Sequence, residues 1–207
     1  MPRVRVHQHV NPLAPFYRQE PKPVELSAVF AHPEHPLHLD IGCARGRFIL
    51  RMAQTEPEWN FLGVEIREPL VEEANRVAAE NGLSNVHYAF CNAMLWLDRL
   101  IKNLPHGVVQ MVTIQFPDPW FKKKHAKRRM VNAELVDTVV CKLGHGGKIF
   151  IQTDIEFLAE EMHTLFKSDE RLKEQECVDN PFVVKTEREL AVESKGLAVH
   201  RYLFQKQ

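Results

Sequence analysis

The hydrophobic pattern from residue 37 onward alternates between two kinds of segment. Short runs of apolar and β-branched residues predict buried strands, and the segments between them carry apolar residues at helical spacing. The predicted strands cover residues 37–43, 60–66, 86–92, 108–116 and 147–154. The predicted helices cover residues 48–54, 68–82, 94–104, 132–143 and 155–168. This alternation is typical of a mostly parallel sheet with helices on both faces.

The two ends of the chain depart from this alternation. The segment GLAVHRYLFQKQ (196–207) reads as a strand with no helix after it, which predicts an antiparallel C-terminal strand. Residues 1–36 hold seven of the 13 prolines and no glycine, with Arg3 and Arg5 near the start. We therefore expect an extended N-terminal arm over residues 1–36. We expect one Rossmann-like α/β domain over residues 37–207, with a mostly parallel seven-stranded sheet.

Length and composition are those of an ordinary soluble protein. With 207 residues, 44% of them hydrophobic and 26% charged, the chain is long enough for one domain with a sizeable core. No stretch approaches the roughly 18 apolar residues of a membrane helix, and the N-terminus lacks the apolar core of a signal peptide. The cysteines form no C-x-x-C pair, so a reducing, cytoplasmic location is expected. They are Cys43, Cys91, Cys141 and Cys177.

Histidines are frequent near the N-terminus, but their spacing matches no zinc pattern. No cysteine or acid completes a ligand set in the sequence, so we expect surface histidines and no metal. The cluster comprises His7, His9, His32, His35 and His38.

Positive charge is concentrated in one segment of a chain that has no net charge. The stretch QFPDPWFKKKHAKRRM (115–130) contains six basic residues within eight positions. Removing these six leaves 21 of the 27 basic residues against 27 acidic ones, so the rest of the chain is net negative. No acid between Asp118 and Glu134 balances the run. Unpaired cations beside aromatic rings suit a polyanion whose bases can stack, although many charge runs are only a solvated surface.

Three strand ends carry side chains that together suit an adenosine ligand, because ligands of such sheets bind beyond the carboxyl ends of the strands. Asp40 suits an ammonium group, Gly42 permits a tight turn, and Arg47 stands where a dinucleotide fingerprint has its third glycine. Glu65 can accept ribose hydroxyls, and Asn92 offers a donor and an acceptor to an adenine edge. Each has a structural alternative: a tight turn, a surface acid, a turn-forming asparagine. Their order on successive strands predicts S-adenosylmethionine.

The fourth strand ends in FPDPWF, where a methyltransferase sheet brings the methyl group and its acceptor together. The prolines on both sides of Asp118 restrict the backbone and hold its carboxylate in place. Trp120 and Phe121 offer rings to a splayed-out base, at roughly 1–3 kcal/mol per stacked base. The alternative is an ordinary proline turn with its aromatic side chains in the core.

With these motifs the sequence resembles the bacterial tRNA (guanine-N7)-methyltransferase family. The matching segments are DIGCARGRF, GVEIR, FPDPWFKKKHAKRR, QTD and TERE, and the resemblance covers roughly residues 37–203. The proline–aspartate–basic segment is the most specific of them, whereas the glycine turn is common to many methyltransferases. Ala44 departs from the family, whose turn more often has glycine there. Alanine fits this position if its φ is negative. The resemblance implies a class I methyltransferase fold.

The resemblance also implies a role for individual residues. Asp40, Glu65 and Asn92 would hold S-adenosylmethionine, and Asp118 would contact the cofactor and be the catalytic acid residue. The substrate would be contacted by Lys122, Asp154, Thr186 and Glu189. The tRNA would be contacted by Lys123, Lys124, His125, Ala126, Lys127, Arg128 and Arg129. The T-x-x-E pair at 186–189 is also a helix capping box, which the sequence alone favours, and the two roles are compatible.

The implied reaction is transfer of a methyl group to N7 of a guanosine in the variable loop of tRNA, by a monomer or homodimer without a second kind of subunit. Two rivals remain. One is a methyltransferase-fold RNA-binding module without turnover. The other is an amino-group methyltransferase acting on another nucleic acid or on a protein, which would more naturally place two adjacent prolines after its acid or asparagine.

Overall fold

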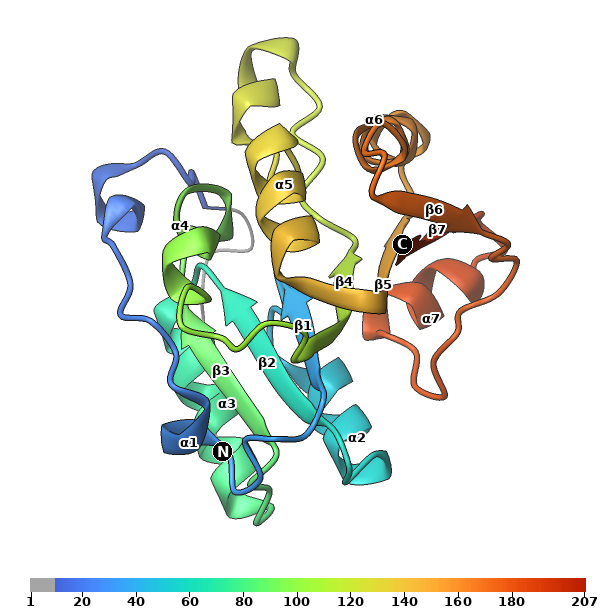
Figure 1. The fold of residues 1–207 in the computed structure, drawn as a ribbon. Helices are drawn as coiled ribbons and strands as arrows, with labels where there is room; N and C mark the ends of the chain where they lie inside the picture. The colour runs from blue at the N-terminus through green and yellow to red at the C-terminus, as the bar shows by residue number, and fades with distance from the viewer. Residues whose placement is uncertain (1–9) are drawn as a thin grey trace.

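The computed structural model describes residues 10–207, so Arg3, Arg5, His7 and His9 lie outside the described residues. The described chain forms a seven-stranded sheet in the order β3-β2-β1-β4-β5-β7-β6, with helices on both faces (Figure 1). Strands β1 to β5 are parallel, and β7 pairs antiparallel with both β5 and β6. The predicted fold class is confirmed.

The parallel strands lie where the hydrophobic pattern predicted them. Strands β1 to β5 span Leu37–Ile41, Asn60–Glu65, Val86–Phe90, Val109–Gln115 and Leu143–Thr153. Only the start of β5 differs by more than two residues from the prediction. The antiparallel β7 is His200–Lys206. The pattern assigned no strand to β6 (Leu172–Gln175), because this short edge strand, LKEQ, has no apolar run.

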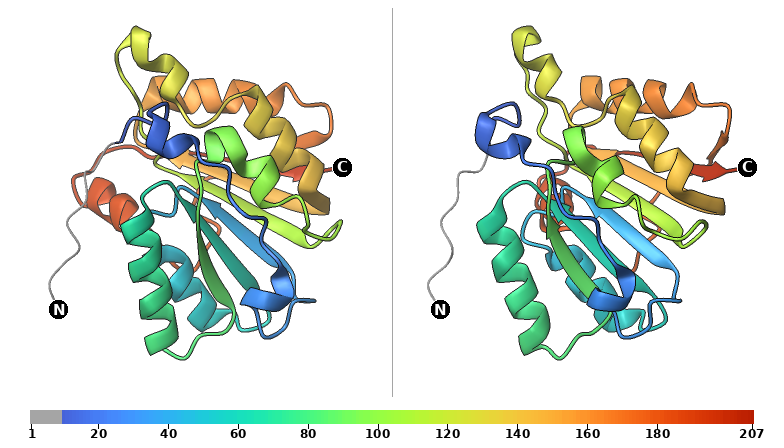
Figure 2. Two further views of the ribbon diagram at one scale, coloured as in Figure 1. Left: turned by 90° about the vertical axis from the view of Figure 1, so that its left-hand side faces the viewer. Right: turned by 60° about the vertical axis from the view of Figure 1, so that its left-hand side comes forward.

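The helices form two layers around the sheet (Figure 2). One face is covered by α4 (Ala93–Leu100), α5 (Ala133–Lys142) and α6 (Glu156–Lys167), and the other by α2 (Arg47–Thr55) and α3 (Glu68–Glu80). The first layer packs on the larger apolar core and the second on a smaller one. Local signals set the helix ends: the Asn132 side chain accepts the N–H of Leu135 at 2.8 Å, and Gly82 follows α3 with a φ of 67°. Within residues 10–207, no helix has both the length and the apolarity to cross a membrane.

The described part of the arm is fixed to the domain. It contains the 3₁₀ helix η1 (Pro15–Arg18) and the short helix α1 (Leu26–Val29). The N–H of Val24 donates to the carbonyl of Leu100 at 2.9 Å, which ties the arm to the end of α4. Val24, Leu26 and Phe30 are buried in the larger core.

Candidate active site

The turn after β1 has three residues with positive φ. Gly42, Ala44 and Gly46 have φ values of 82°, 51° and 67°. Gly46 also lacks room for a side chain, since a Cβ there would lie 2.1 Å from the ring of Tyr88. The condition under which alanine would fit without strain, a negative φ, is not met at Ala44, whose N–H donates to Oε2 of Glu65 at 2.9 Å. The alanine methyl therefore costs roughly 1 kcal/mol relative to glycine.

Glu65, at the end of β2, is buried and saturated with hydrogen bonds. Its Oε1 accepts from the backbone N–H and from Nε of Arg67, at 3.0 and 2.8 Å. Its Oε2 accepts from Ala44 and from Nη2 of Arg67 at 3.1 Å. A carboxylate has about four acceptor positions, so all are in use. Burial disfavours the charge of Arg67, but the Glu65 carboxylate and the charge of Asp118 raise its pKa overall.

Asp40, at the end of β1, belongs to a buried chain of hydrogen bonds. The hydroxyl of Thr113 donates to its Oδ1 at 2.6 Å, and Nε2 of His38 lies 3.0 Å from the same hydroxyl. Thr113 has only one proton to give, so His38 donates from Nε2 when Asp40 is ionised. His38 is buried, so the expectation of a surface histidine is wrong at this position, and burial lowers its pKa to about 3. Burial also raises the pKa of Asp40 to about 6, against the opposing hydrogen bonds of Thr113 and Gln115.

The N-terminal arm closes over Asn92, which follows β3 and is buried. Its side-chain nitrogen donates to the carbonyls of Pro12 and Tyr17, at 2.8 and 3.1 Å. Both amide protons are thereby used within the protein, and the side-chain oxygen is what Asn92 can offer to a ligand. The sequence predicted that Asn92 offers adenine both a donor and an acceptor. The N-terminal arm occupies the donor, so the acceptor remains for the ligand.

The loop after β4 contains two strained residues on either side of Asp118. Phe116 and Trp120 have φ values of 50° and 44°, a region that bulky residues rarely adopt. Asp118 itself is half-buried, and the N–H of Phe116 donates to the carbonyl of Gln152 at 2.8 Å. Such strain persists where surrounding contacts hold it, and it is found preferentially at functional sites.

The basic run forms the 3₁₀ helix η2 (Lys123–Arg128), and its side chains fall into two groups. The guanidinium of Arg128 lies 4.9 Å from the ring centre of Trp120, and the ring of His125 meets Trp120 edge-on at 5.7 Å. Trp120 is therefore packed within the protein, whereas Phe121 meets Phe157 edge-on at 5.8 Å but is 67% exposed, which leaves ring surface for a base. Ala126 is half-buried. The exposed cations are Lys122, Lys123, Lys124 and Lys127.

Thr186 caps helix α7 (Glu187–Glu193), which confirms the threonine half of the predicted capping box. Oγ1 of Thr186 accepts the N–H of Glu189 at 3.1 Å. The Glu189 side chain is fully buried, and its carboxylate accepts hydrogen bonds from three neighbouring side chains. These are Asn180, Gln152 and Arg201. In this structure the carboxylate of Glu189 is therefore engaged inside the protein.

Asp154 directly follows β5 and lies at the same edge of the sheet as the other strand-end residues. Its carboxylate pairs with Arg188, the second residue of α7. This ion pair places the start of α7 beside the end of β5, so the segments QTD and TERE meet in space.

The chain matches known proteins over its whole length. A family model described as "Putative methyltransferase" covers residues 34–202. The tRNA (guanine-N(7)-)-methyltransferase of Trichormus variabilis is 52% identical over 210 residues, covering 100% of this chain and 98% of that protein. The chain belongs to the tRNA (guanine-N(7)-)-methyltransferase family. The Synechococcus elongatus member is 50% identical, and the match covers 100% of this chain and 99% of that protein. The family predicted from the motifs is confirmed.

Solved structures of more distant proteins have the same fold as this chain. The 16S rRNA methyltransferase KamB matches with a TM-score of 0.60 at 13% identity, covering 88% of this chain and 91% of its own. The antibiotic-resistance methyltransferase Kmr matches with a TM-score of 0.59 at 17% identity, covering 87% and 91%. At such identities the likeness concerns the class I methyltransferase fold alone.

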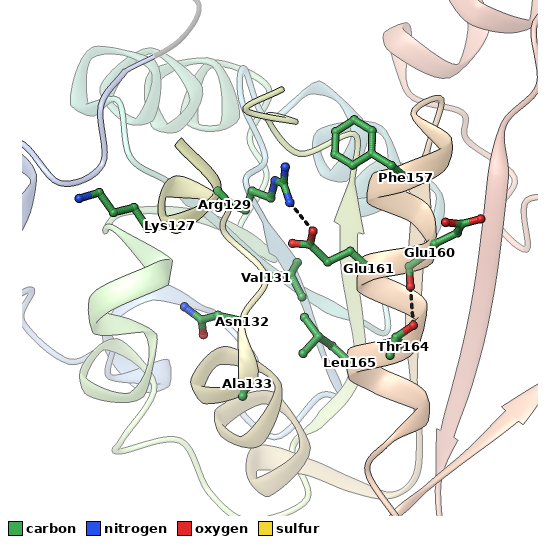
Figure 3. A pocket seen from close by; sticks show the side chains of 11 residues that line it. Lys127, Arg129, Val131, Asn132, Ala133, Phe157, Glu160, Glu161, Thr164 and Leu165 are labelled. Carbon is green, nitrogen blue, oxygen red and sulfur yellow. Dashed lines mark hydrogen bonds and ion pairs between the residues drawn. The ribbon is translucent and has the colours of Figure 1, made fainter. Parts of the chain in front are cut away.

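A cavity of about 680 Å³ in this methyltransferase-family chain lies beside the basic run (Figure 3). The end of η2, the start of α5 and one side of α6 line it, with Lys127, Arg129 and Glu161 among the lining residues. The residues at the ends of β1, β2 and β3 do not line it. This cavity is therefore separate from the predicted cofactor site at the ends of these strands.

One group of described side chains could hold a metal ion, and it lies away from this site. His32, Glu34 and His35 bring one ligand atom each to within 4.8 Å of one another, so the expectation that no acid would join these histidines is wrong. They precede β1, at the end of the sheet opposite to Asp40. That the site itself uses no metal stays a prediction.

Sequence reasoning missed Arg67 and Thr113, although both contact predicted site residues. Arg67 lies within the GVEIR segment, two residues after Glu65, so its position was a usable signal. Thr113 is a hydroxyl residue between Val112 and Ile114 in the central strand β4, beside Asp40 in the parallel pairing of β1 with β4. A buried hydroxyl opposite a buried acid is a pattern that could have been found.

Proposed function

We propose that this protein transfers a methyl group from S-adenosylmethionine to N7 of a guanosine in the variable loop of tRNA, forming 7-methylguanosine. The observation that carries this proposal is the placement of Asp40, Glu65, Asn92 and Asp118 at or just beyond the carboxyl ends of β1, β2, β3 and β4, which are neighbours in the sheet. The relatives that match over the full length carry the name of this activity. We assign the protein to the cytoplasm, as a monomer or homodimer.

The side chains fit the proposed methyl donor, which supplies the electrophilic methyl group when it is bound. Asp40 offers a buried carboxylate to an ammonium group, and Asn92 offers its side-chain oxygen to the adenine amino group. Glu65 fits the ribose hydroxyls once the guanidinium of Arg67 withdraws from its acceptor positions. The negative charge of Asp118 also acts on that guanidinium.

The remaining work on the acceptor is alignment. N7 of neutral guanine carries a free lone pair, so no proton has to be removed before attack. The loop after β4 holds Asp118 where it stabilises the positive charge that methylation places on the base, or orients the base through its N–H groups. The exposed ring of Phe121 provides a surface on which a base can stack.

Residues beyond the ends of β4 and β5 and at the start of α7 are assigned to binding of the substrate. Lys122 and Asp154 flank the loop after β4 and the end of β5, and we assign both to substrate binding. Thr186 and Glu189 fix the start of α7 beside Asp154. For Glu189 to accept from the N–H groups of guanine, its carboxylate must first leave Asn180 or Arg201. The exposed lysines hold the phosphate backbone.

The test is transfer of labelled methyl from S-adenosylmethionine to an unmodified tRNA transcript. A second transcript, made with 7-deazaguanosine in place of guanosine, is the control because it lacks only the proposed acceptor atom. Transfer to the first and none to the second is the expected result. Equal transfer to both would identify an amino-group methyltransferase. No transfer to either, with tRNA still bound, would identify an RNA-binding module without turnover.

A further inference from the structure

Arg129 ends the basic run, yet its guanidinium points into the protein. Its side chain is only 13% exposed, in contrast to the exposed lysines before it. Nη1 pairs with the carboxylate of Glu161 on α6, and the guanidinium lies 5.0 Å from the ring centre of Phe157 on the same helix. Figure 3 shows Arg129 and Glu161 facing one another, while Lys127 points away from α6.

The other nitrogens of Arg129 reach the loop that contains Asp118. Nε donates to the carbonyl of Pro119 at 3.1 Å, and Nη2 lies 3.5 Å from the carbonyl of Trp120. These are the two carbonyls that immediately follow Asp118. The planar side chain of Arg129 therefore joins the loop that contains Asp118 to α6.

This loop needs support from outside itself. Pro117 and Pro119 have no N–H group, so the loop has few donors with which to form its own hydrogen bonds. Phe116 and Trp120 hold positive φ values, which persist only where surrounding contacts impose them. Phe116 is anchored through Gln152 before Asp118, and Arg129 supplies an anchor after it.

We propose that Arg129, held by Glu161 and Phe157, is a positioning residue that fixes the loop carrying Asp118, and that it does not bind tRNA phosphate. The inference rests on the proposed methyl transfer, for which Asp118 is the catalytic residue. The charge of Arg129 is satisfied by Glu161, so its loss removes little attraction for RNA. Its planar fork bonds a carboxylate and a carbonyl at once, which a lysine ammonium cannot reproduce.

The experiment compares Glu161→Gln with Glu160→Gln. The two acids are neighbours on α6 and line the same cavity, but only Glu161 pairs with Arg129. Both variants remove one negative charge near the RNA-facing surface, so their effects on tRNA affinity should be alike. We expect Glu161→Gln to lower the single-turnover methyl-transfer rate at saturating tRNA and cofactor by about tenfold to 100-fold, the cost of a misplaced catalytic group. Glu160→Gln should keep the wild-type rate.

The second comparison sets Arg129→Gln against Lys127→Gln. Loss of an RNA contact reduces the slope of log affinity against log salt by about 0.7–0.9. We expect that reduction for Lys127→Gln only. Arg129→Gln should keep the slope and lose rate, and Arg129→Lys should not restore the rate. Should Arg129 variants fail to fold, Glu161→Gln decides, since it leaves the guanidinium in place but loosens its hold.

Two results would overturn the proposal: a wild-type rate for Glu161→Gln, or a reduced salt slope with an unchanged saturated rate for Arg129→Gln. Either result would indicate that Arg129 contacts tRNA, as the sequence resemblance implied. The wild-type protein assayed on the guanosine and 7-deazaguanosine transcripts tests the proposed function separately. Failure of that function would appear there, with the wild-type chain, and so is distinguishable from failure of the role given to Arg129.

Discussion

The cofactor side and the RNA side of the site differ in how firmly their side chains are held in place without a ligand. On the cofactor side, Asp40, Glu65 and Asn92 are buried, and each is hydrogen-bonded to a residue distant in sequence. On the RNA side, the exposed lysines lie on a short 3₁₀ helix that follows a strained loop. A small ligand needs donors and acceptors at fixed positions, whereas a polyanion needs charge whose placement matters less. The following experiments separate the two sides.

Asp118 lies between the two sides, and its loss should have the largest effect. Asp118→Ala should lower the single-turnover rate by about 10²- to 10³-fold, the usual loss when an electrostatic partner of the transition state is removed. The affinity for tRNA should stay at the wild-type value. Lys123→Ala is the opposite control, with weaker tRNA binding and an intact rate at saturation. A near-normal rate for Asp118→Ala would leave that carboxylate a structural role only.

Gly46→Ala should damage the cofactor side by crowding. The added methyl would lie 2.1 Å from Tyr88 and would also oppose a φ of 67°, for a total loss of about 3 kcal/mol in the free energy of unfolding. Gly82→Ala is the matched control, since it has the same φ but nothing within 4 Å of an added Cβ. It should lose only about 1 kcal/mol. Urea unfolding of both variants measures the difference, and equal losses would exclude the crowding.

Replacing Lys122, Lys123, Lys124 and Lys127 together by alanine should affect the RNA side alone. Four lost phosphate contacts reduce the salt slope of tRNA affinity by about 3, at 0.7–0.9 per contact. Binding of S-adenosylhomocysteine should be unchanged. Four exposed lysines elsewhere serve as the control set, and their replacement should leave the slope near its wild-type value. The control residues are Lys102, Lys167, Lys173 and Lys195.

The raised pKa of Asp40 predicts a pH dependence on the cofactor side. Below a pKa of about 6 the carboxyl group is protonated and must lose its proton before it can bind an ammonium group. The affinity for S-adenosylhomocysteine should therefore be level above that pH and weaken below it, approaching about tenfold per pH unit. Calorimetry at several pH values measures this, and Asp40→Asn should bind weakly with no such slope. A pH-independent affinity in the wild type would contradict the assignment.

Ala44→Gly should give the smallest change, and in the stabilising direction. It relieves the left-handed strain at Ala44 but adds backbone freedom to the unfolded chain, for a net gain of about 0.5–1 kcal/mol in the free energy of unfolding. Thermal or urea unfolding measures the gain. A loss of stability would mean that the alanine methyl makes a packing contact that outweighs its strain.

The sequence predicted those parts of the molecule that depend on local pattern. Parallel strands bring their carboxyl ends to one edge of the sheet, so strand-end residues such as Asp40 and Glu65 could be grouped from the order of the strands alone. The φ of Ala44 could not be predicted, because it follows from a hydrogen bond to Glu65 across a neighbouring strand. The partners of Asn92 lie 75 and 80 residues away in an arm with no periodic pattern. Arg129 looked like its basic neighbours, and only the fold sets it apart.

The buried chain from His38 through Thr113 to Asp40 gives the protein an internal spectroscopic indicator. With Asp40 ionised, the single hydroxyl proton of Thr113 points to the carboxylate, and His38 must keep its own proton on Nε2. A protonated Asp40 can donate to Thr113 instead, which allows the hydroxyl to turn toward the imidazole. The ¹⁵N resonance of His38 would then shift between the values of a protonated and an unprotonated ring nitrogen. Nuclear magnetic resonance of one histidine could thus report the charge of Asp40 without any label on the ligand.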